Sequence, residues 1–290
     1  MVIKLGIPKG SLEKRTIELF AKAGYKIAKS ERSYFPKIDD REIEIMMVKA
    51  QEMPRYVSDG ILDVGLCGRD WVIESGLDVV EICELSYSKE TNQPVRWVLA
   101  VPKDSSINRP GELEGKRIAT ELVQVTKKYL KDKGINANVE FSWGATEAKP
   151  LTKLADAVVE LTETGTTLEA HNLKVIDTVL TSTTILIANK EVIMDEWKKN
   201  KTDSIILLLK GALEAEKKVG LKMNIHKDNL PNLLDNLPSL KNPTISQLTD
   251  PEWLAIETII DEEVVRRIIP ALKVRGAEGI VEYPLNKVIP

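Results

Sequence analysis

The stretch ELTETGTTL, residues 160–168, gathers four threonine hydroxyls, one glycine and two carboxylates within nine positions. It follows an apolar run, LADAVV, that reads as a buried strand. Thr166 and Glu169 have the S/T-x-x-E spacing of a capping box, so we expect a helix to begin around Thr166 or Thr167. A helix start offers free N–H groups, Gly165 lets the backbone approach an anion closely, and the hydroxyls add donors. The stretch therefore predicts a phosphate-binding loop.

The two carboxylates of this loop restrict what its ligand can be. Glu160 and Glu163 would repel a bare phosphate. They suit a ligand that also carries hydrogen-bond donors, such as ribose hydroxyls, or one that brings a bridging Mg²⁺. A phosphorylated sugar with a metal-bound diphosphate meets both conditions. A capped helix after a core strand, with glutamates on a solvated rim, has the same spacing, so the pattern alone leaves both readings open.

Other sites for nucleotides, nucleic acids or structural metals find no support in the sequence. It lacks the G-x-x-x-x-G-K-[ST] pattern of a P-loop and the G-x-G-x-x-G dinucleotide fingerprint. The net charge of -3 gives no basic field for nucleic acid. Cys67, Cys83, His171 and His226 do not have zinc-ligand spacing, and a reducing cytoplasm is the simplest compartment for two unpaired cysteines. No apolar run is long enough to span a membrane.

The predicted elements that carry the loop form two consecutive β/α series. Strands are expected at 2–7, 42–48 and 62–66 in the first series, and at 96–101, 117–119 and 139–143 in the second. A polar connector at 86–94 separates the two series. The β-rich stretch 175–188 could lead the chain back to the first series. These features predict an α/β fold with two lobes.

The last 70 or so residues have a different order of elements. Strand, helix, strand, strand, helix and strand follow one another, which is the ferredoxin-like pattern. The second helix of this region should begin after Asp261 and end at Gly276, and Pro270 should kink or shorten it. We therefore expect a separate C-terminal α+β domain.

Several motifs resemble those of one enzyme family. LADAVVELTETGTTLEAHNL resembles the signature of the ATP phosphoribosyltransferases, which catalyse the first step of histidine biosynthesis. The segments GIPKGSL, DGILDVGLCGRDWV, GKRIATEL and GATEAKPLTKLADA follow in the order of that family. In the tail, NPTISQLTDPEWLAIETII and VRGAEGIVEYPLNKVI resemble the regulatory domain of the family's long form. The resemblance covers nearly the whole chain.

The resemblance implies three domains and a homo-oligomer. Residues 1–90 with 179–215 would form one catalytic lobe, 91–178 the second, and 216–290 a ferredoxin-like regulatory domain. The two lobes would have a type II periplasmic-binding-protein-like fold with the active site in the cleft. The family implies dimers that assemble into hexamers.

The resemblance also implies a reaction and its residues. N1 of the ATP adenine attacks C1 of phosphoribosyl pyrophosphate (PRPP), giving phosphoribosyl-ATP and pyrophosphate, with Mg²⁺ required. Lys9 and Lys49 are the candidate catalytic cations for the leaving pyrophosphate. The PRPP-binding residues carried over are Glu160, Thr162, Glu163, Thr164, Gly165, Thr166, Thr167 and Leu168. Histidine would inhibit by binding between regulatory domains, near Asn242, Thr244, Ile259 and Gly279.

Two other functions are compatible with parts of this pattern. A type I phosphoribosyltransferase acting on a free base would place two adjacent acidic residues before the loop, whereas Glu160 and Glu163 are separated. A non-enzymatic bilobed binding or sensor protein would show no turnover and no dependence on PRPP. The sequence has no signal peptide and no helix-turn-helix segment to support that second alternative.

Overall fold

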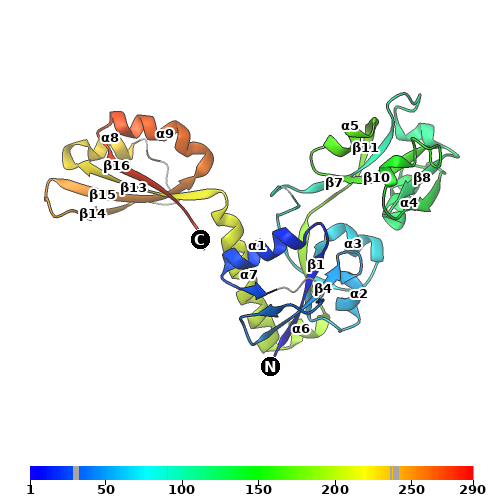
Figure 1. The fold of residues 1–290 in the computed structure, drawn as a ribbon, viewed down its shortest axis with the longest axis horizontal. Coiled ribbons are helices and arrows are strands. Elements are labelled where there is room, and N and C mark those ends of the chain that lie inside the picture. Colours follow the sequence, from blue (N-terminus) through cyan, green and yellow to red (C-terminus); the bar gives the residue numbers. More distant parts are fainter. Residues whose placement is uncertain (29–32, 90, 236, 238–241, 290) are drawn as a thin grey trace. The chain divides into compact units, whose positions relative to one another are not determined.

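The computed structural model describes residues 1–28, 33–89, 91–235, 237 and 242–289. Contacts divide the chain into two compact units, 1–21 with 25–204 and 22–24 with 205–290. The first unit holds two five-stranded sheets and the second holds one four-stranded sheet. Figure 1 labels their elements along the chain. Among the described residues, no helix combines the length and the apolar character needed to cross a membrane.

The first sheet has the strand order β4-β1-β5-β12-β6. Its strands are β1 (Ile3–Lys9), β4 (Ile43–Lys49), β5 (Val64–Gly68), β6 (Val80–Leu85) and β12 (Thr184–Ala188). Helices α1 (Glu13–Ala23), α2 (Met53–Ser58) and α3 (Arg69–Ser75) follow β1, β4 and β5. β1 runs parallel to β4 and β5, while β12 is antiparallel to β5 and β6. The central strands are almost wholly buried, as their continuous apolar runs require.

The second sheet has the strand order β11-β7-β10-β8-β9. Its strands are β7 (Val95–Pro102), β8 (Arg117–Thr120), β9 (Asn138–Phe141), β10 (Ala157–Thr162) and β11 (Leu173–Ser182). Helix α4 (Val123–Asp132) joins β8 to β9, and α5 (Thr166–Ala170) joins β10 to β11. β8 is parallel to β9 and β10, whereas β7 is antiparallel to β10 and β11.

The chain passes between these two sheets twice. It leaves the first sheet after β6 to enter β7, and it returns where β11 ends at Ser182 and β12 begins at Thr184 (Figure 1). The two passages lie side by side, because the Thr184 hydroxyl donates to the Tyr87 carbonyl oxygen at 2.7 Å. The return to the first sheet was expected from the β-rich stretch 175–188. The two α/β lobes of the predicted fold class are confirmed.

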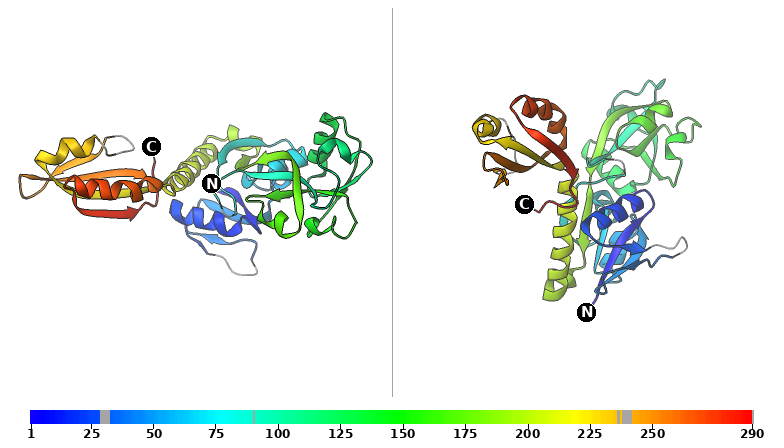
Figure 2. Two further views of the ribbon diagram at one scale, coloured as in Figure 1. Left: turned by 90° about the horizontal axis from the view of Figure 1, so that it is seen from above. Right: turned by 60° about the vertical axis from the view of Figure 1, so that its left-hand side comes forward.

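The C-terminal sheet has the antiparallel order β14-β15-β13-β16. Its elements are β13 (Lys218–His226), α8 (Leu230–Leu234), β14 (Thr244–Gln247), β15 (Trp253–Asp261), α9 (Glu262–Val274) and β16 (Glu278–Pro284). Figures 1 and 2 show α8 and α9 on one face of this sheet. The core between helices and sheet includes Leu221, Ile256, Val265 and Leu272. This is the ferredoxin-like order predicted from the sequence.

Helix α9 differs from its predicted form at one point. It continues through Pro270 to Val274, so the expected shortening does not occur. Pro270 is exposed, which lets its ring and the carbonyl that loses its N–H donor face solvent. Val265, Ile268 and Leu272 are buried on the opposite face and hold the helix on the sheet across the proline. Packing therefore outweighs the local cost of proline here.

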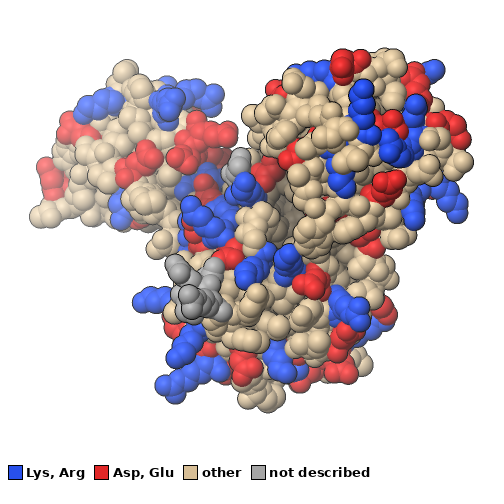
Figure 3. Space-filling model, turned by 45° about the vertical axis from the view of Figure 1, so that its right-hand side comes forward, with Lys and Arg blue, Asp and Glu red and all other residues tan. Residues whose placement is uncertain are grey.

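The remaining described elements are small, apart from one long helix. They are β2 (Ile27–Ala28), β3 (Lys37–Ile38), α6 (Lys190–Met194), α7 (Glu196–Ala215) and the 3₁₀ turns Pro110–Leu113, Thr146–Ala148 and Lys227–Asn229. On the face drawn in Figure 3, the acidic and basic side chains are interspersed rather than gathered into a patch of one sign.

Candidate active site

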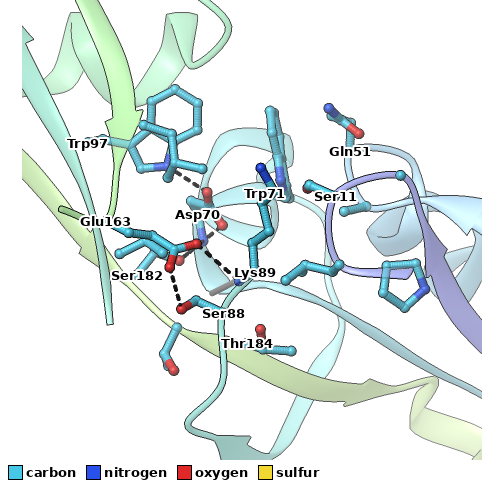
Figure 4. Close-up of a pocket in the computed structure, with 18 of the residues that line it drawn as sticks. Ser11, Gln51, Asp70, Trp71, Ser88, Lys89, Trp97, Glu163, Ser182 and Thr184 are labelled. Atoms are coloured by element: carbon cyan, nitrogen blue, oxygen red, sulfur yellow. Dashed lines mark hydrogen bonds between the residues drawn. The ribbon is translucent and has the colours of Figure 1, made fainter. Parts of the chain in front are cut away.

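A pocket of about 370 Å³ in the first unit is lined by residues of both sheets. The first sheet contributes the turn after β1, the end of β4 and the start of α3. The second contributes β7, the end of β10 and Glu163 of the following loop. Figure 4 shows part of this lining. The lining includes Lys9, Lys49, Glu160 and Glu163, four of the residues that the sequence analysis assigned to one site.

The loop after β10 is shaped by its own hydroxyls and by one glycine. Gly165 has φ +88°, a left-handed conformation that glycine adopts without strain. Its N–H donates to Thr162 Oγ1 at 2.8 Å, and the hydroxyls of Thr164 and Thr166 lie 2.7 Å apart. Helix α5 begins at Thr166, where the sequence analysis expected a helix. Thr162 and residues 164–168 are not among the residues that line the pocket.

The predicted capping box is wrong in its details. Gly165 occupies the N-cap position of α5, and no side chain caps the helix. Thr166 cannot act as the N-cap because it already has helical geometry as the first residue of α5. Leu168 is 1% exposed and packs with Val98 and Val158. The side chain of Leu168 therefore anchors the loop to the core, which leaves only its backbone to meet a ligand.

Glu160 lies in an environment that disfavours its charged form. Burial raises the pKa of this carboxyl from 4.5 to about 7, and the nearby charges of Glu147 and Glu121 act in the same direction. The Leu161 N–H, which donates to Glu160 Oε1 at 3.2 Å, opposes this shift only in part. A cation beside Glu160 would lower that pKa and restore the carboxylate.

Glu163 ties the loop to the passage between β6 and β7. Its carboxylate accepts hydrogen bonds from the Ser88 hydroxyl and the Lys89 N–H, each at 3.0 Å (Figure 4). The Thr91 hydroxyl donates to the same carboxylate at 3.4 Å. Glu163 therefore positions the loop, a role that the sequence pattern did not indicate.

Lys9 and Lys49 lie at the carboxyl ends of two neighbouring parallel strands. They are direct register partners in the β1–β4 pair. Both side chains are exposed, and each ammonium lies over an aromatic ring. Lys9 Nζ is 4.0 Å from the ring centroid of Tyr34, and Lys49 Nζ is 4.4 Å from that of Trp143. Two cations thus share one edge of the first sheet, opposite Glu160 and Glu163 in the pocket lining.

A buried carboxylate that the sequence analysis missed joins the two sheets at the pocket. Asp70, at the start of α3, is 3% exposed. It accepts from Trp97 Nε1 at 2.6 Å and from the Ser182 hydroxyl at 3.0 Å, and its own N–H donates to Ser182 Oγ at 3.0 Å (Figure 4). Burial raises the pKa of Asp70. Its partners are 27 and 112 positions away, so no local pattern could have revealed this network.

Thr183 is a second residue that the sequence analysis missed. It is 5% exposed, it lies between β11 and β12, and it lines the pocket. Within the described part of the chain, its hydroxyl has no hydrogen-bond partner. A buried hydroxyl without a partner is costly, so this group is available to a ligand in the pocket.

The four residues assigned to histidine binding lie in the second unit. Asn242 and Thr244 are exposed, and Thr244 is on the edge strand β14. Ile259 is on β15, and Gly279, with φ +55°, is on β16 at the other edge of the sheet. This sheet therefore holds Thr244 and Gly279 on opposite edge strands.

Comparison with known proteins decides the family. The family model of ATP phosphoribosyltransferase (HisG) matches residues 49–221, more than half of the chain. The chain belongs to the ATP phosphoribosyltransferase family. A second model, the HisG C-terminal domain, matches residues 215–287. The family resemblance and the long form inferred from the sequence are confirmed.

Relatives in the ATP phosphoribosyltransferase family match along the whole chain. The ATP phosphoribosyltransferase of Thermodesulfovibrio yellowstonii is 60% identical over 289 residues, covering 100% of this chain and 99% of the relative. That of Solibacter usitatus is also 60% identical, with 100% of both chains covered. The enzyme of Chlorobaculum parvum is 56% identical over 99% of this chain and 98% of its own length.

Solved structures agree with this family and with the bilobed fold. The ATP phosphoribosyltransferase (HisG:HisZ) complex of Thermotoga maritima matches with a TM-score of 0.63 and 30% identity, covering 73% of this chain and 99% of that chain. Tv2483, solved with bound L-arginine, matches with a TM-score of 0.52 at 10% identity and so shares the fold alone. The free-base transferase and the sensor considered above are not supported, because the family model and the full-length relatives are ATP phosphoribosyltransferases.

Proposed function

We propose that this ATP phosphoribosyltransferase joins ATP to PRPP in the pocket of the first unit, as the first step of L-histidine biosynthesis. The observation that carries the proposal is the meeting of Glu160 and Glu163, on β10 and its loop, with Lys9 and Lys49 of the opposite sheet. A bond forms between N1 of adenine and C1 of the ribose, and the bond from C1 to the pyrophosphate oxygen breaks. Pyrophosphate leaves with the bonding electrons.

The loop would hold the ribose 5′-phosphate of PRPP. The free N–H groups at the start of α5 and the hydroxyls of Thr164, Thr166 and Thr167 are suited to phosphate oxygens. The left-handed conformation of Gly165 lets the phosphate come close to the backbone of the loop. The Gly165 N–H donates a hydrogen bond to the Thr162 hydroxyl, which keeps the loop in this conformation. Glu160 would accept from the ribose hydroxyls. In this assignment Glu163 and Leu168 act mainly by fixing the loop to Ser88, Lys89 and Thr91 and to the core.

Lys9 and Lys49 would stabilise the leaving pyrophosphate. Negative charge grows on the leaving oxygen as the bond from C1 breaks, and two ammonium groups at one sheet edge lower the energy of that charge. No protein nucleophile is required, because the adenine nitrogen itself attacks. Catalysis then consists of positioning and charge stabilisation.

A divalent metal, which we take to be Mg²⁺, suits the pocket if the substrate supplies most of its ligands. Among the described residues no group of three or more His, Cys, Asp or Glu side chains could hold a metal by itself. Mg²⁺ commonly binds one or two carboxylates together with substrate phosphates and water. Glu160, with its raised pKa, and Glu121 are the carboxylates best placed for this. When bound, the metal neutralises charge on the pyrophosphate.

The second unit would regulate the first. We propose the domain limits 1–90 with 179–215, 91–178 and 216–290, and histidine binding near Asn242, Thr244, Ile259 and Gly279. Because Thr244 and Gly279 lie on opposite edges of one sheet, a site that includes both needs sheets from two protomers. Such a site agrees with a homo-oligomer of dimers and hexamers. We assign the reaction to the cytoplasm, where ATP is supplied.

An assay of product formation tests the proposed function. Protein is mixed with ATP, PRPP and Mg²⁺, pyrophosphatase removes the pyrophosphate, and phosphoribosyl-ATP is followed by absorbance. We expect turnover that depends on all three components. Lys9→Ala should lower kcat by about a hundredfold, since it removes one charge-stabilising group. Lys14→Ala, on the exposed face of α1, serves as the matched control. A folded wild-type protein that makes no product would refute the proposal.

The loop assignment has a separate test in Gly165→Val. A Cβ at this position would meet no atom within 4 Å, so the substitution acts through the left-handed φ and not through a clash. We expect a normal circular dichroism spectrum and a loss of PRPP binding by calorimetry. Unchanged affinity for PRPP would contradict the assignment.

A further inference from the structure

A cavity of about 810 Å³ in the first unit is lined only by residues around the second sheet, in the segments 102–107, 112–117 and 150–156. We call it the distal groove. It shares no lining residue with the candidate active-site pocket. It lies at the amino ends of β8 and β10, whereas the pocket residues Glu121 and Glu160 lie just after β8 and near the carboxyl end of β10. The distal groove is therefore a separate cavity at the other edge of the same sheet.

The inner surface of the distal groove is apolar. Ile107, Pro150 and Ala155 are buried members of the lining, and Leu151 is an apolar member that is 47% exposed. Sites for small organic molecules combine such an apolar surface with a few polar groups, and they range from about 300 to 1,000 Å³. The distal groove lies in the upper part of that range, so it has room for a whole ligand.

Two walls of the distal groove are held in place by cationic side chains. Lys174 Nζ, on β11, donates to the Ser105 carbonyl oxygen at 2.8 Å and to Asn108 Oδ1 at 2.9 Å, which fixes the loop after β7. The Arg117 guanidinium donates to the Lys153 carbonyl oxygen at 2.9 Å, which fixes the segment before β10. A site with walls fixed before binding loses less conformational entropy when the ligand enters.

The three carboxylates of the distal groove differ in their partners. Asp156 accepts from the Arg117 N–H at 2.8 Å and lies 3.9 Å from the guanidinium of the same residue. Glu112 accepts from a backbone N–H at 2.8 Å and from Arg109 Nε at 3.0 Å. Within the described part of the chain, the Asp104 carboxylate has no hydrogen-bond or ion-pair partner. Only Asp104 therefore leaves its negative charge uncompensated in the lining.

Two cations of the distal groove are available to a ligand. Lys116 and Lys153 are exposed, and neither ammonium has an ion-pair partner among the residues that the structure describes. Lys153 has φ +60°, a left-handed conformation that glycine adopts without strain and that other residues seldom adopt. Strained positions of this kind are concentrated at functional sites. Two free ammonium groups beside an apolar surface suit an anion that has an apolar body.

We propose that the distal groove binds a small organic anion, which carries a single acid group on an apolar body. Lys116 and Lys153 hold the acid group, and the apolar body packs on Ile107 and Leu151. Asp104 disfavours ligands with many negative charges, such as a nucleoside triphosphate, because the repulsion between like charges grows with the charge of the ligand. The site is distinct from the proposed phosphoribosyl transfer, which takes place in the other pocket.

A binding experiment with the dye anilinonaphthalenesulfonate, one sulfonate on an apolar body, tests the proposal. Its dissociation constant is measured by fluorescence titration of full-length wild type, Leu151→Asp and the matched control Leu154→Asp. Leu154 is 60% exposed in the same segment and does not line the groove. Leu151→Asp should weaken binding about tenfold or more, because it places a carboxylate beside the sulfonate, and the control should stay within about twofold. Partial unfolding increases binding of this dye, so a misfolded variant cannot imitate the loss.

A second pair of variants tests the cations. Lys116→Ala combined with Lys153→Gly keeps the left-handed turn, and it should weaken dye binding about tenfold and reduce its dependence on salt. Lys127→Ala combined with Lys128→Ala is the control, because these exposed lysines of α4 lie outside the groove. Excess ATP or PRPP should not displace the dye. No dye binding to wild type, equal dissociation constants within either pair, or displacement by a substrate would overturn the proposal. None of these measurements needs turnover, so they stand apart from the test of the proposed function.

Discussion

At the scale of single residues, the pocket contains polar groups that lower the stability of the folded protein by a measurable amount. Glu160 and Thr183 are the clearest cases. One is a carboxyl with a raised pKa, and the other is a buried hydroxyl without a partner in the described structure. Each is unfavourable in the empty pocket and useful once a substrate supplies its partner. Groups that lower the stability of the fold in this way are typical of a site that binds a ligand.

Glu160→Gln should stabilise the ligand-free protein in a way that depends on pH. The pKa of Glu160 is 4.5 in the unfolded chain and about 7 in the folded one, so the folded state holds a proton that the unfolded state releases in this window. Stability of wild type therefore falls as pH rises from about 4.5 to 7. Glutamine removes this dependence. Melting temperatures at pH 5 and pH 8 should show the larger gain for Glu160→Gln at pH 8, and equal gains would contradict the prediction.

Thr183→Val should separate stability from function. Valine has a similar shape and no unpaired hydroxyl, so the melting temperature should stay equal or rise. Activity should fall about two- to tenfold in kcat/KM, the loss of one hydrogen bond to substrate. Thr126→Val is the matched control, since Thr126 is also buried with an unpartnered hydroxyl but lies in α4, outside the pocket lining. A similar loss of activity in both variants would argue against a ligand contact at Thr183.

At the scale of elements, α3 and α4 are linked by a cap supplied from outside the capped helix. The N-cap residue of α4, Leu122, has no side-chain acceptor, and Glu74 takes its place. Glu74→Ala should lower the free energy of unfolding by about 1–2 kcal/mol, as for other lost caps with a charged acceptor. Glu74→Gln, which keeps one acceptor, should lose about half as much. Urea unfolding measures both, and identical stabilities for all three proteins would refute the cap.

The helices and strands also differ in how far they could be predicted from the sequence. The start of α5 and the ferredoxin-like order follow from local patterns of hydroxyls, glycines and alternating apolar residues. Whether Gly165 or Thr166 is the cap could not be predicted, because the same residues allow both geometries. Asp70, Trp97 and Ser182 meet only after two sheets are formed, so their network depends on tertiary structure. Lys9 and Lys49 were assigned together from the family resemblance, but that they are direct neighbours could be known only from the β1–β4 register.

At the scale of the whole molecule, the proposed histidine site can be tested through inhibition. Thr244→Ala should raise the histidine concentration for half-inhibition at least tenfold, each activity being normalised to the uninhibited value of the same variant. Ser246→Ala is the control, because Ser246 is exposed on the same strand β14. Equal sensitivity of both variants would remove Thr244 from the site. Sedimentation of each protein with histidine checks whether the oligomer changes.

The paired passages between the two sheets also limit how the first unit can open. One covalent tether would leave the sheets free to swivel about several axes. Two adjacent tethers, linked by the hydrogen bond from Thr184 to the Tyr87 carbonyl, leave a single hinge line that runs through both. Any rotation of one sheet against the other would then follow that line. The lysines at the ends of β1 and β4 and the loop after β10 would approach one another along a single arc.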